Sequence, residues 1–321
     1  MSSKRFASAV EYLDSEDEDP NYWREIPEEL SVYILGKMKD RAALRQVSMT
    51  DKLLHRHTSI LYDRIVVSTR EFYNELTRQL YADTPPMTFP EEGAPMSISW
   101  LTKLNWREFV GFDPDSKYKL LNMGGVIETI GKFLSSSELI LEHLDLSALF
   151  CSFNTEMDPN VLPLTLSSAL LVNDVLTTLN LRFNRIGDEG AVALGDALRG
   201  NGVLKTIDLR YNVIGFEGAA AIAEALRGNG VLKTLNLRNN YIGDAGATAI
   251  GEALAVNGVL IDLNLMMNEI GDEGATALAS ALRVNGGLKK INLSYNCFFG
   301  EGKGAIRDAV SGRVGFELEM L

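Results

Sequence analysis

The chain of 321 residues lacks the features that define several large classes of protein. Its two cysteines, Cys151 and Cys297, are too few for a disulfide framework, which fits a reducing compartment. Its three histidines, His55, His57 and His143, do not form a ligand set with metal-site spacing. No run of 18 apolar residues is present, so we predict no transmembrane helix. The acidic N-terminal segment has no apolar core, so we predict no secretory signal.

Basic residues are also scarce, with 31 against 43 acidic residues and a net charge of −12. This balance argues against a nucleic-acid partner. From Leu176 onward the chain is nearly neutral, so most of the negative charge lies upstream, much of it in residues 11–19. Proline is absent after Pro163, whereas most glycines follow Leu176. The chain therefore consists of two halves with different compositions, which meet near residue 140.

The second half contains an internal repeat of 28 residues. Its segments begin at Leu176, Leu204, Leu232, Leu260 and Leu288. A fixed period of this length indicates one strand–helix unit stacked on itself as a solenoid. Because such folds bind partners along an extended face, we expect a binding protein with no catalytic residues, no cofactor and no metal.

The repeat from Leu204 to Val231 shows how each unit is expected to fold. Leu204, Ile207 and Leu209 are predicted to point inward from a short parallel strand. A helix should follow, with Ala219, Ile222, Ala223 and Leu226 as its buried stripe. Gly228, Asn229 and Gly230 are predicted to end it because they tolerate positive φ.

Two polar or small residue types recur at fixed positions in every unit. We predict that the asparagine column satisfies backbone groups in the turns between units; it consists of Asn184, Asn212, Asn240, Asn268 and Asn296. Glycine pairs such as Gly187/Gly190 and Gly271/Gly274 are predicted to provide turn geometry and close packing.

Residues Leu176 to Arg313 resemble the ribonuclease-inhibitor type of leucine-rich repeat, through the pattern LxxLxLxxN-xIGxxGAxALAxAL. The resemblance implies an α/β fold: a leucine-rich-repeat solenoid, or horseshoe, with strands on its concave side. An earlier repeat begins at Leu141 and carries a seven-residue insertion. A more degenerate one starts within residues 98–104, with a helix over 117–133. Residues 314–321 are predicted to form a final strand that caps the array.

The N-terminal part contains a helical pattern with a different character. Pro27 lies just inside a helix start with acidic residues in its first turn. Residues 25–67 resemble an F-box, which docks a chain onto the adaptor subunit of SCF-type ubiquitin ligases. The resemblance implies that the adaptor contacts are Ile26, Pro27, Leu30, Ile34, Leu35 and Met38. The alternative is a helical cap that closes the N-terminal end of the solenoid.

These patterns divide the chain into four segments. We predict an acidic disordered tail at 1–20 and an all-α F-box-like module at 21–62. A linker with degenerate repeats should occupy 63–139, and the ribonuclease-inhibitor-type repeats with their C-terminal cap 140–321.

The outward positions along the strands are the candidate binding residues, because the fold constrains them least. They are Arg182, Phe183, Asp208, Arg210, Tyr211, Arg238, Met266, Met267 and Tyr295. Adjacent strands lie about 4.8 Å apart, so the three arginines should lie within roughly 10 Å of one another. An acidic or phosphorylated partner segment would relieve their repulsion. The alternative is that repeat duplication copied a solvated arginine.

The sequence therefore predicts the substrate-recognition adaptor of an SCF-type ubiquitin ligase, binding a protein target on the concave face. The alternatives are an interaction scaffold without a ligase link and, as a third class, a GTPase-activating protein of the Ran type, which carries the same repeat. We expect a monomer in the cytoplasm or nucleus, or in host cytosol if the chain is a pathogen effector. The target itself cannot be deduced from these residues.

Overall fold

The computed structural model describes residues 103–105, 123–135, 141–149 and 158–320. All of these belong to one compact unit of the chain, Ile65–Leu321. The predicted tail at 1–20 and the F-box-like module at 21–62 lie outside the described residues, so their boundaries stay predictions.

The described residues form a regular alternation of short strands and helices. The strands are β1 (Lys103–Asn105), β2 (His143–Asp145), β3 (Thr178–Asn180), β4 (Thr206–Asp208), β5 (Thr234–Asn236), β6 (Asp262–Asn264), β7 (Lys290–Asn292) and β8 (Glu317–Glu319). The helices are α7 (Met123–Leu134), α8 (Val161–Leu170), α9 (Gly187–Gly200), α10 (Phe216–Gly228), α11 (Gly243–Val256), α12 (Asp272–Val284) and α13 (Gly300–Val310). These elements include the expected earlier repeat at β2 and the final strand at β8.

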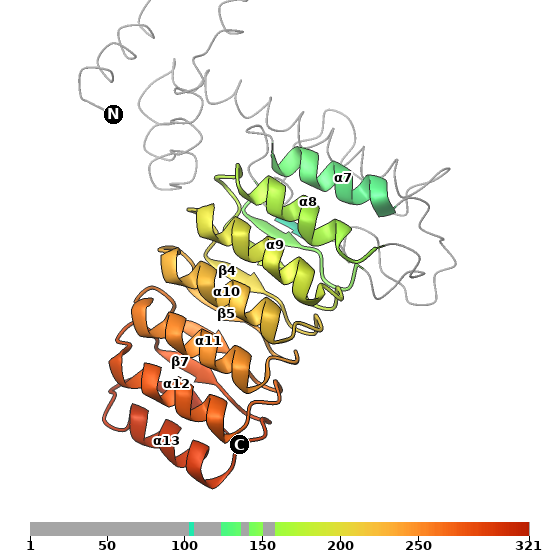
Figure 1. The fold of residues 1–321 in the computed structure, drawn as a ribbon. Helices are drawn as coiled ribbons and strands as arrows, with labels where there is room; N and C mark the ends of the chain where they lie inside the picture. The colour runs from blue at the N-terminus through green and yellow to red at the C-terminus, as the bar shows by residue number, and fades with distance from the viewer. Residues whose placement is uncertain (1–102, 106–122, 136–140, 150–157, 321) are drawn as a thin grey trace, which may run out of the picture. The chain divides into compact units, whose positions relative to one another are not determined.

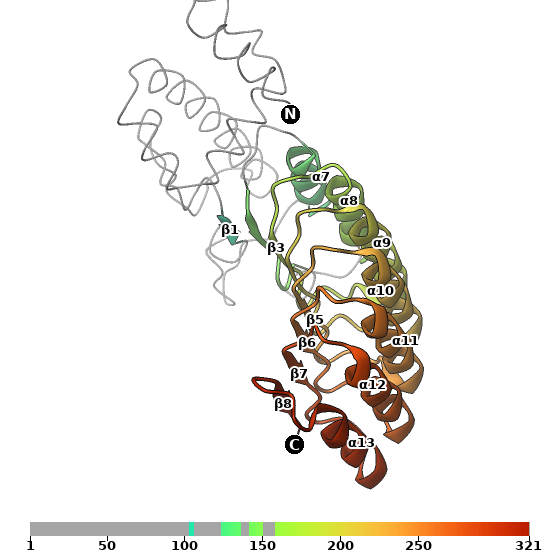
Figure 2. The same ribbon diagram turned by 90° about the vertical axis from the view of Figure 1, so that its left-hand side faces the viewer.

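All strands join one parallel sheet in sequence order, from β1 to β8. The register keeps the 28-residue period, so that Thr178, Thr206 and Thr234 lie side by side on β3, β4 and β5. Helices α7 to α13 stack next to one another (Figure 1) and cover one side of the sheet, and none of these described helices lies on its other side (Figure 2). Strands repeat about every 4.8 Å and packed helices about every 8–10 Å, so the array curves with its strands on the inner side.

The core lies between the sheet and the helices, as predicted. In the repeat from Leu204, the strand residues Leu204, Ile207 and Leu209 are completely buried. They face the buried stripe of α10, which includes Ile222 and Leu226. The same pattern recurs in each unit, so every helix buries its apolar face against the strand of its own repeat.

The predicted asparagine column satisfies the backbone between units. The Asn212 side chain donates from Nδ2 to the carbonyl oxygen of Leu181 in the preceding unit, at 2.9 Å. Its Oδ1 accepts the backbone N–H of Asn184 at 2.8 Å. Asn184, Asn240, Asn268 and Asn296 make equivalent contacts. The structural interpretation of this column is confirmed.

Helix α10 ends at the predicted residues, Gly228 to Gly230, but the predicted mechanism of its ending is wrong. Neither glycine has a positive φ, and Asn229 ends α10 in an extended conformation with φ −78° and ψ 116°. Its Nδ2 donates to the Leu198 carbonyl at 2.6 Å, and its Oδ1 accepts the N–H of Leu232 at 2.8 Å. Tethering the chain to the preceding helix makes a left-handed turn unnecessary. Asn201, Asn257 and Asn285 repeat this arrangement.

A carboxylate from one unit caps the helix of the next. Asp188 Oδ1 accepts the N–H groups of Gly215 and Gly218, both at 2.8 Å, where the positive end of α10 favours a negative charge. Asp244 caps α12 in the same way, and Asp272 caps α13. The glycine pair Gly271/Gly274 therefore serves this contact, because a Cβ at Gly274 would lie 2.6 Å from Asp244 Oδ1.

Phe216 interrupts this rule in the repeat between Asp188 and Asp244. It replaces the capping aspartate, so α11 receives no carboxylate from the preceding unit. Gly243, the counterpart of Gly215, takes a left-handed φ of +59° and donates its N–H to the Asn268 carbonyl instead. Gly215, which has the carboxylate, stays at φ −91°. The presence of the capping carboxylate thus goes with the backbone conformation at the start of the next helix.

Replacing Asn212 by alanine should lower the free energy of unfolding by about 2 kcal/mol, because the buried N–H of Asn184 loses its partner and the Leu181 carbonyl keeps only the Asn184 side chain. Urea denaturation measures this loss. Asn236→Ala is the matched control: Asn236 is half-buried and accepts one hydrogen bond, from the Arg238 N–H, so its removal should cost less than about 1 kcal/mol. Equal losses in the two variants would contradict the structural role of the column.

Phe216→Asp should raise the free energy of unfolding by about 1 kcal/mol, since it restores the carboxylate that the neighbouring units supply and removes a 55% exposed phenylalanine. The opposite change, Asp188→Ala, should lower it by about 1–2 kcal/mol. Both follow from denaturant titration. A destabilised Phe216→Asp variant would show that the cap is not transferable between units.

Candidate protein-binding face

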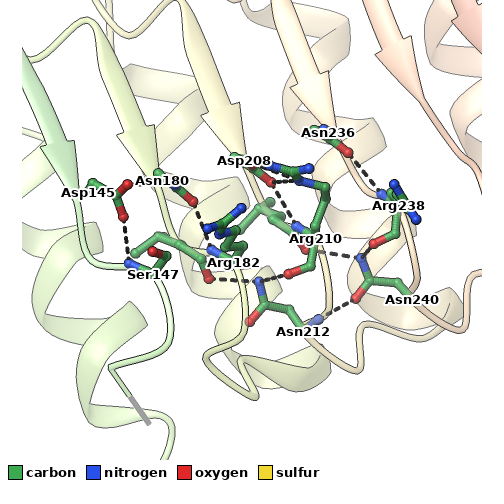
Figure 3. Close-up of polar contacts among 12 residues, drawn as sticks. Asp145, Ser147, Asn180, Arg182, Asp208, Arg210, Asn212, Asn236, Arg238 and Asn240 are labelled. Carbon is green, nitrogen blue, oxygen red and sulfur yellow. Dashed lines mark hydrogen bonds and ion pairs between the residues drawn. The ribbon is translucent and has the colours of Figure 1, made fainter. Parts of the chain in front are cut away.

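The nine predicted binding residues lie at or just after the C-terminal ends of strands β3 to β7. We call them the strand face: Arg182, Phe183, Asp208, Arg210, Tyr211, Arg238, Met266, Met267 and Tyr295. Each strand in this region ends in an asparagine or aspartate whose side chain accepts the N–H two residues later (Figure 3). Asn180 binds the Arg182 N–H at 3.2 Å, and Asp208 binds the Arg210 N–H at 3.1 Å.

The aromatic and methionine residues of the strand face adopt an unusual backbone conformation. Phe183, Tyr211, Met267 and Tyr295 have φ between 57° and 61°, in the left-handed region that bulky residues rarely occupy. The prediction placed them in extended strand rows, and this part is corrected. Their N–H groups still bond across the array: Phe183 donates to the Arg210 carbonyl at 3.0 Å. The left-handed turn therefore continues the inter-unit bonding beyond the strands.

Two of these aromatic side chains form a stacked pair. The rings of Phe183 and Tyr211 have centroids 4.2 Å apart and an interplanar angle of 16°. The guanidinium of Arg182 lies 6.0 Å from the Phe183 ring centroid, and that of Arg238 lies 5.9 Å from the Tyr211 centroid. The pair is therefore flanked by one arginine on each side, at the limit of a cation–π contact.

The three arginines are not equivalent, because Asp208 pairs with Arg210 alone among them. Arg210 binds Asp208 with two fork contacts, Nε to Oδ1 at 2.9 Å and Nη2 to Oδ2 at 2.6 Å. These hydrogen bonds raise the pKa of the Arg210 guanidinium, although partial burial opposes the change. Asp208 thus neutralises Arg210 locally and also closes the turn after β4.

Arg182 and Arg238 remain uncommitted. Within the described part of the chain neither forms an ion pair, and the Nε of each is buried without a hydrogen-bond partner. A buried donor without a partner costs free energy. Both side chains would therefore gain from an acceptor that a partner molecule supplies.

The strand face changes character toward the C-terminal end of the array. Met266 is half-buried, Met267 is 38% exposed and Tyr295 is 59% exposed, which makes this part apolar. Beside it, Lys290 on β7 contacts Glu319 at 2.6 Å and Glu317 at 3.3 Å on β8, and these contacts raise the pKa of Lys290. This ion-pair cluster fixes the capping strand to the sheet.

Asp262 on β6 occupies the place that threonine takes on β3, β4 and β5. Its burial raises the pKa of the carboxyl, and the two glutamates of β8 act in the same direction against Lys290. A raised pKa means that the folded state binds this proton more tightly than the unfolded state. Above the raised pKa, the ionised carboxylate therefore lowers the stability of the fold.

Asp262→Asn should accordingly raise the free energy of unfolding at pH 7, by about 0.5 kcal/mol after allowance for solvent screening. The gain should disappear as the pH falls below the ordinary aspartate value of 3.8, where both states are protonated. Denaturant titrations across this range measure it. Asp196→Asn is the control, since the Asp196 side chain is 69% exposed, and a similar pH-dependent gain there would contradict the burial explanation.

Other kinds of site were sought in the same residues. The described residues contain no cluster of three histidine, cysteine or carboxylate side chains that could hold a metal ion. They also contain no helix with the length and hydropathy needed to cross a bilayer.

A family model described as "Leucine Rich repeat" matches residues 172–195, 200–223, 228–251 and 257–279. These four segments are leucine-rich repeats. The matched segments run from just after α8 into α12, so they include every strand-face residue except Tyr295. No curated protein sequence matches the chain.

Several solved structures resemble the repeats. Leiomodin-1 actin-binding site 2 is 25% identical with a TM-score of 0.38, covering 46% of this chain and 86% of that one. The C-terminal domain of tropomodulin from Caenorhabditis elegans is 14% identical with a TM-score of 0.38, covering 45% and 90%. The yeast complex of Rad7 and Elc1 matches at 14% identity and a TM-score of 0.28, covering 99% and 98%. The fold assignment rests on the repeat match and the sheet topology.

The structure places the nine predicted strand-face residues at or just after the ends of β3 to β7, and Figure 3 shows Arg182, Asp208, Arg210 and Arg238 side by side. The six predicted adaptor contacts, Ile26 to Met38, lie outside the described residues. Sequence reasoning missed the second asparagine column, which includes Asn201, Asn229, Asn257 and Asn285. Its 28-residue spacing was a visible signal.

Proposed function

We propose that the chain is a non-enzymatic adaptor that holds a protein target on the strand face of its leucine-rich repeats. The observation that carries this proposal is a row of half-buried and exposed aromatic, methionine and arginine side chains on a backbone fixed by hydrogen bonds between units. Tyrosine and arginine are the residues most often found at the energetic centres of protein interfaces. A rigid backbone reduces the ordering cost of binding.

The residues of the strand face support a binding function more directly than a structural one. The left-handed turn itself is structural, because it also occurs at Asn239 and its N–H groups bond across the units, but the fold does not require aromatic or methionine side chains there. The Nε atoms of Arg182 and Arg238 have no hydrogen-bond partner, which costs free energy. A partner that contacts these two side chains would recover part of that cost.

The finer proposal is that the target is presented to an SCF-type ubiquitin ligase. It rests on the F-box-like sequence of residues 21–62, in particular Ile26, Pro27 and Leu30, and on the pairing of that module with repeats that bind a partner. The chain would break no bond itself and would act by bringing ligase and target together. We expect this to occur in the cytoplasm or nucleus.

An interaction scaffold without a ligase link is the second candidate. The strand face is assembled wholly from residues after Leu176, so binding there does not require residues 21–62. In that case these residues would act only as a cap. A GTPase-activating function of the Ran type is the third class, and a single-turnover GTPase assay tests it.

The full chain should bind the purified adaptor subunit of the ligase. A Pro27→Ala, Leu30→Ala double variant should not bind it, because that change removes the predicted apolar contact. Bio-layer interferometry measures the interaction. An Arg182→Glu, Arg238→Glu variant is the matched control and should capture the adaptor normally. Absence of binding by the wild-type chain would exclude the ligase proposal and leave the scaffold.

A further inference from the structure

Formal charge along the strand face follows an alternating order. Asp145 lies at the end of β2, Arg182 follows β3 and the neutralised Asp208–Arg210 pair belongs to β4. Arg238 follows β5, and Asp262 begins β6. From β2 to β6 the charges are therefore negative, positive, neutral, positive and negative, with Asp262 at the start of its strand and the others at or after the strand ends; Figure 3 shows the side chains from Asp145 to Arg238 in this order.

We propose that the strand face binds an extended peptide carrying two carboxylates three residues apart, one against Arg182 and one against Arg238. This inference rests on the proposed function, since it assumes that the strand face is where a partner binds. It goes further by naming the feature of the partner that is recognised.

The spacing follows from the sheet. Arg182 and Arg238 follow β3 and β5, which are separated by β4, so their backbones lie about 10 Å apart. An extended or polyproline-type peptide advances about 3.1–3.3 Å per residue, so residues i and i+3 span the same distance. A peptide that crosses the strands can thus present one carboxylate to each arginine.

Arg210 takes no part in this recognition. Its fork is already filled by Asp208, with contacts of 2.9 and 2.6 Å. The residues between the two free arginines are instead the stacked rings of Phe183 and Tyr211, which offer apolar surface to the residues between the two acids. Beyond Arg238, Met266 and Met267 offer an apolar contact to the residue that follows the second acid.

The acidic margins limit the charge that the partner can carry. Asp145 is held in place by the Asn180 side chain, which donates to it at 2.9 Å, and by the Ser147 N–H at 2.9 Å. On the other side of the two free arginines lies Asp262, together with Glu317 and Glu319, which share the single cation Lys290. A long polyanion, including a nucleic-acid strand, would meet these carboxylates at both ends. The charge order therefore favours two isolated carboxylates over a continuous run of negative charge.

The probe is a fluorescein-labelled peptide, Gly-Gly-Glu-Pro-Pro-Glu-Leu-Gly-Gly, titrated with the full chain and followed by fluorescence anisotropy. Arg182→Gln and Arg238→Gln should each weaken binding by about tenfold, because a charged hydrogen bond is lost. Arg210→Gln should change it less than twofold. Asp208→Asn should strengthen it, since it releases Arg210 and installs the residue found at Asn180 and Asn236.

Matched probes complete the experiment. The peptide with both glutamates replaced by glutamine should not bind, and an octaglutamate or an oligouridylate of similar length should bind more weakly than the probe. Thermal unfolding of every variant checks that the fold is retained. The inference is overturned if the probe does not bind, if Arg210→Gln weakens binding as much as Arg182→Gln, or if either polyanion binds more tightly.

The two proposals fail in different ways. A protein that copurifies with the chain can be identified, purified and tested against the Arg182→Glu, Arg238→Glu variant. If that variant no longer binds this protein and the probe peptide does not bind the wild-type chain, the binding role of the strand face survives and the two-carboxylate inference is wrong. If neither interaction responds to these arginines, both are wrong.

Discussion

Hydrogen bonding between neighbouring units is the constraint on which the rest of this structure depends. The turn after a three-residue strand cannot pair all of its own backbone N–H and C=O groups, and leaving such groups unpaired in the interior costs free energy. Asn212 and its equivalents bond the turn after each strand to the adjoining units, and Asn229 and its equivalents bond each helix end to the preceding one. Because both columns reach across units, no unit is complete without its neighbours.

This dependence separates the residues that build the array from those that are free to vary. The buried leucines, the asparagines and the capping aspartates are fixed by their contacts. The residues after each strand only have to donate and accept in the inter-unit ladder, which a left-handed residue such as Tyr211 still does. Their side chains are consequently free to carry chemistry, and the strand face is where arginine, aromatic and methionine residues collect.

Much of the fold could be predicted from the sequence, because the 28-residue period repeats both the burial and the turn residues. Leu204, Ile207, Leu209 and Ile222 were placed correctly on this basis. The helix ending at Asn229 was not, because local propensity suggests a left-handed glycine, whereas the deciding bond comes from Leu198 in the preceding unit. Contacts between units are invisible to a reading of one repeat.

The residues of the candidate site could be predicted from the sequence, but which of their charges are neutralised could not. The positions of Arg182, Arg210 and Arg238 follow from the period alone. Which of them is neutralised depends on the side-chain geometry of Asp208, which the sequence presents only as one outward residue among others. Likewise the left-handed turn at Phe183 depends on the hydrogen bond to Arg210 in the next unit.

The missing carboxylate at Phe216 has a mechanical consequence. The joints of α9 with α10, α11 with α12 and α12 with α13 each have an aspartate latch, but the joint of α10 with α11 has instead an exposed ion pair, Arg227 with Glu252 at 2.8 Å. Exposed pairs of this kind contribute little and are screened by salt. Among the joints from α9 to α13, the one behind Tyr211 and Arg238 therefore depends least on buried polar contacts between helices.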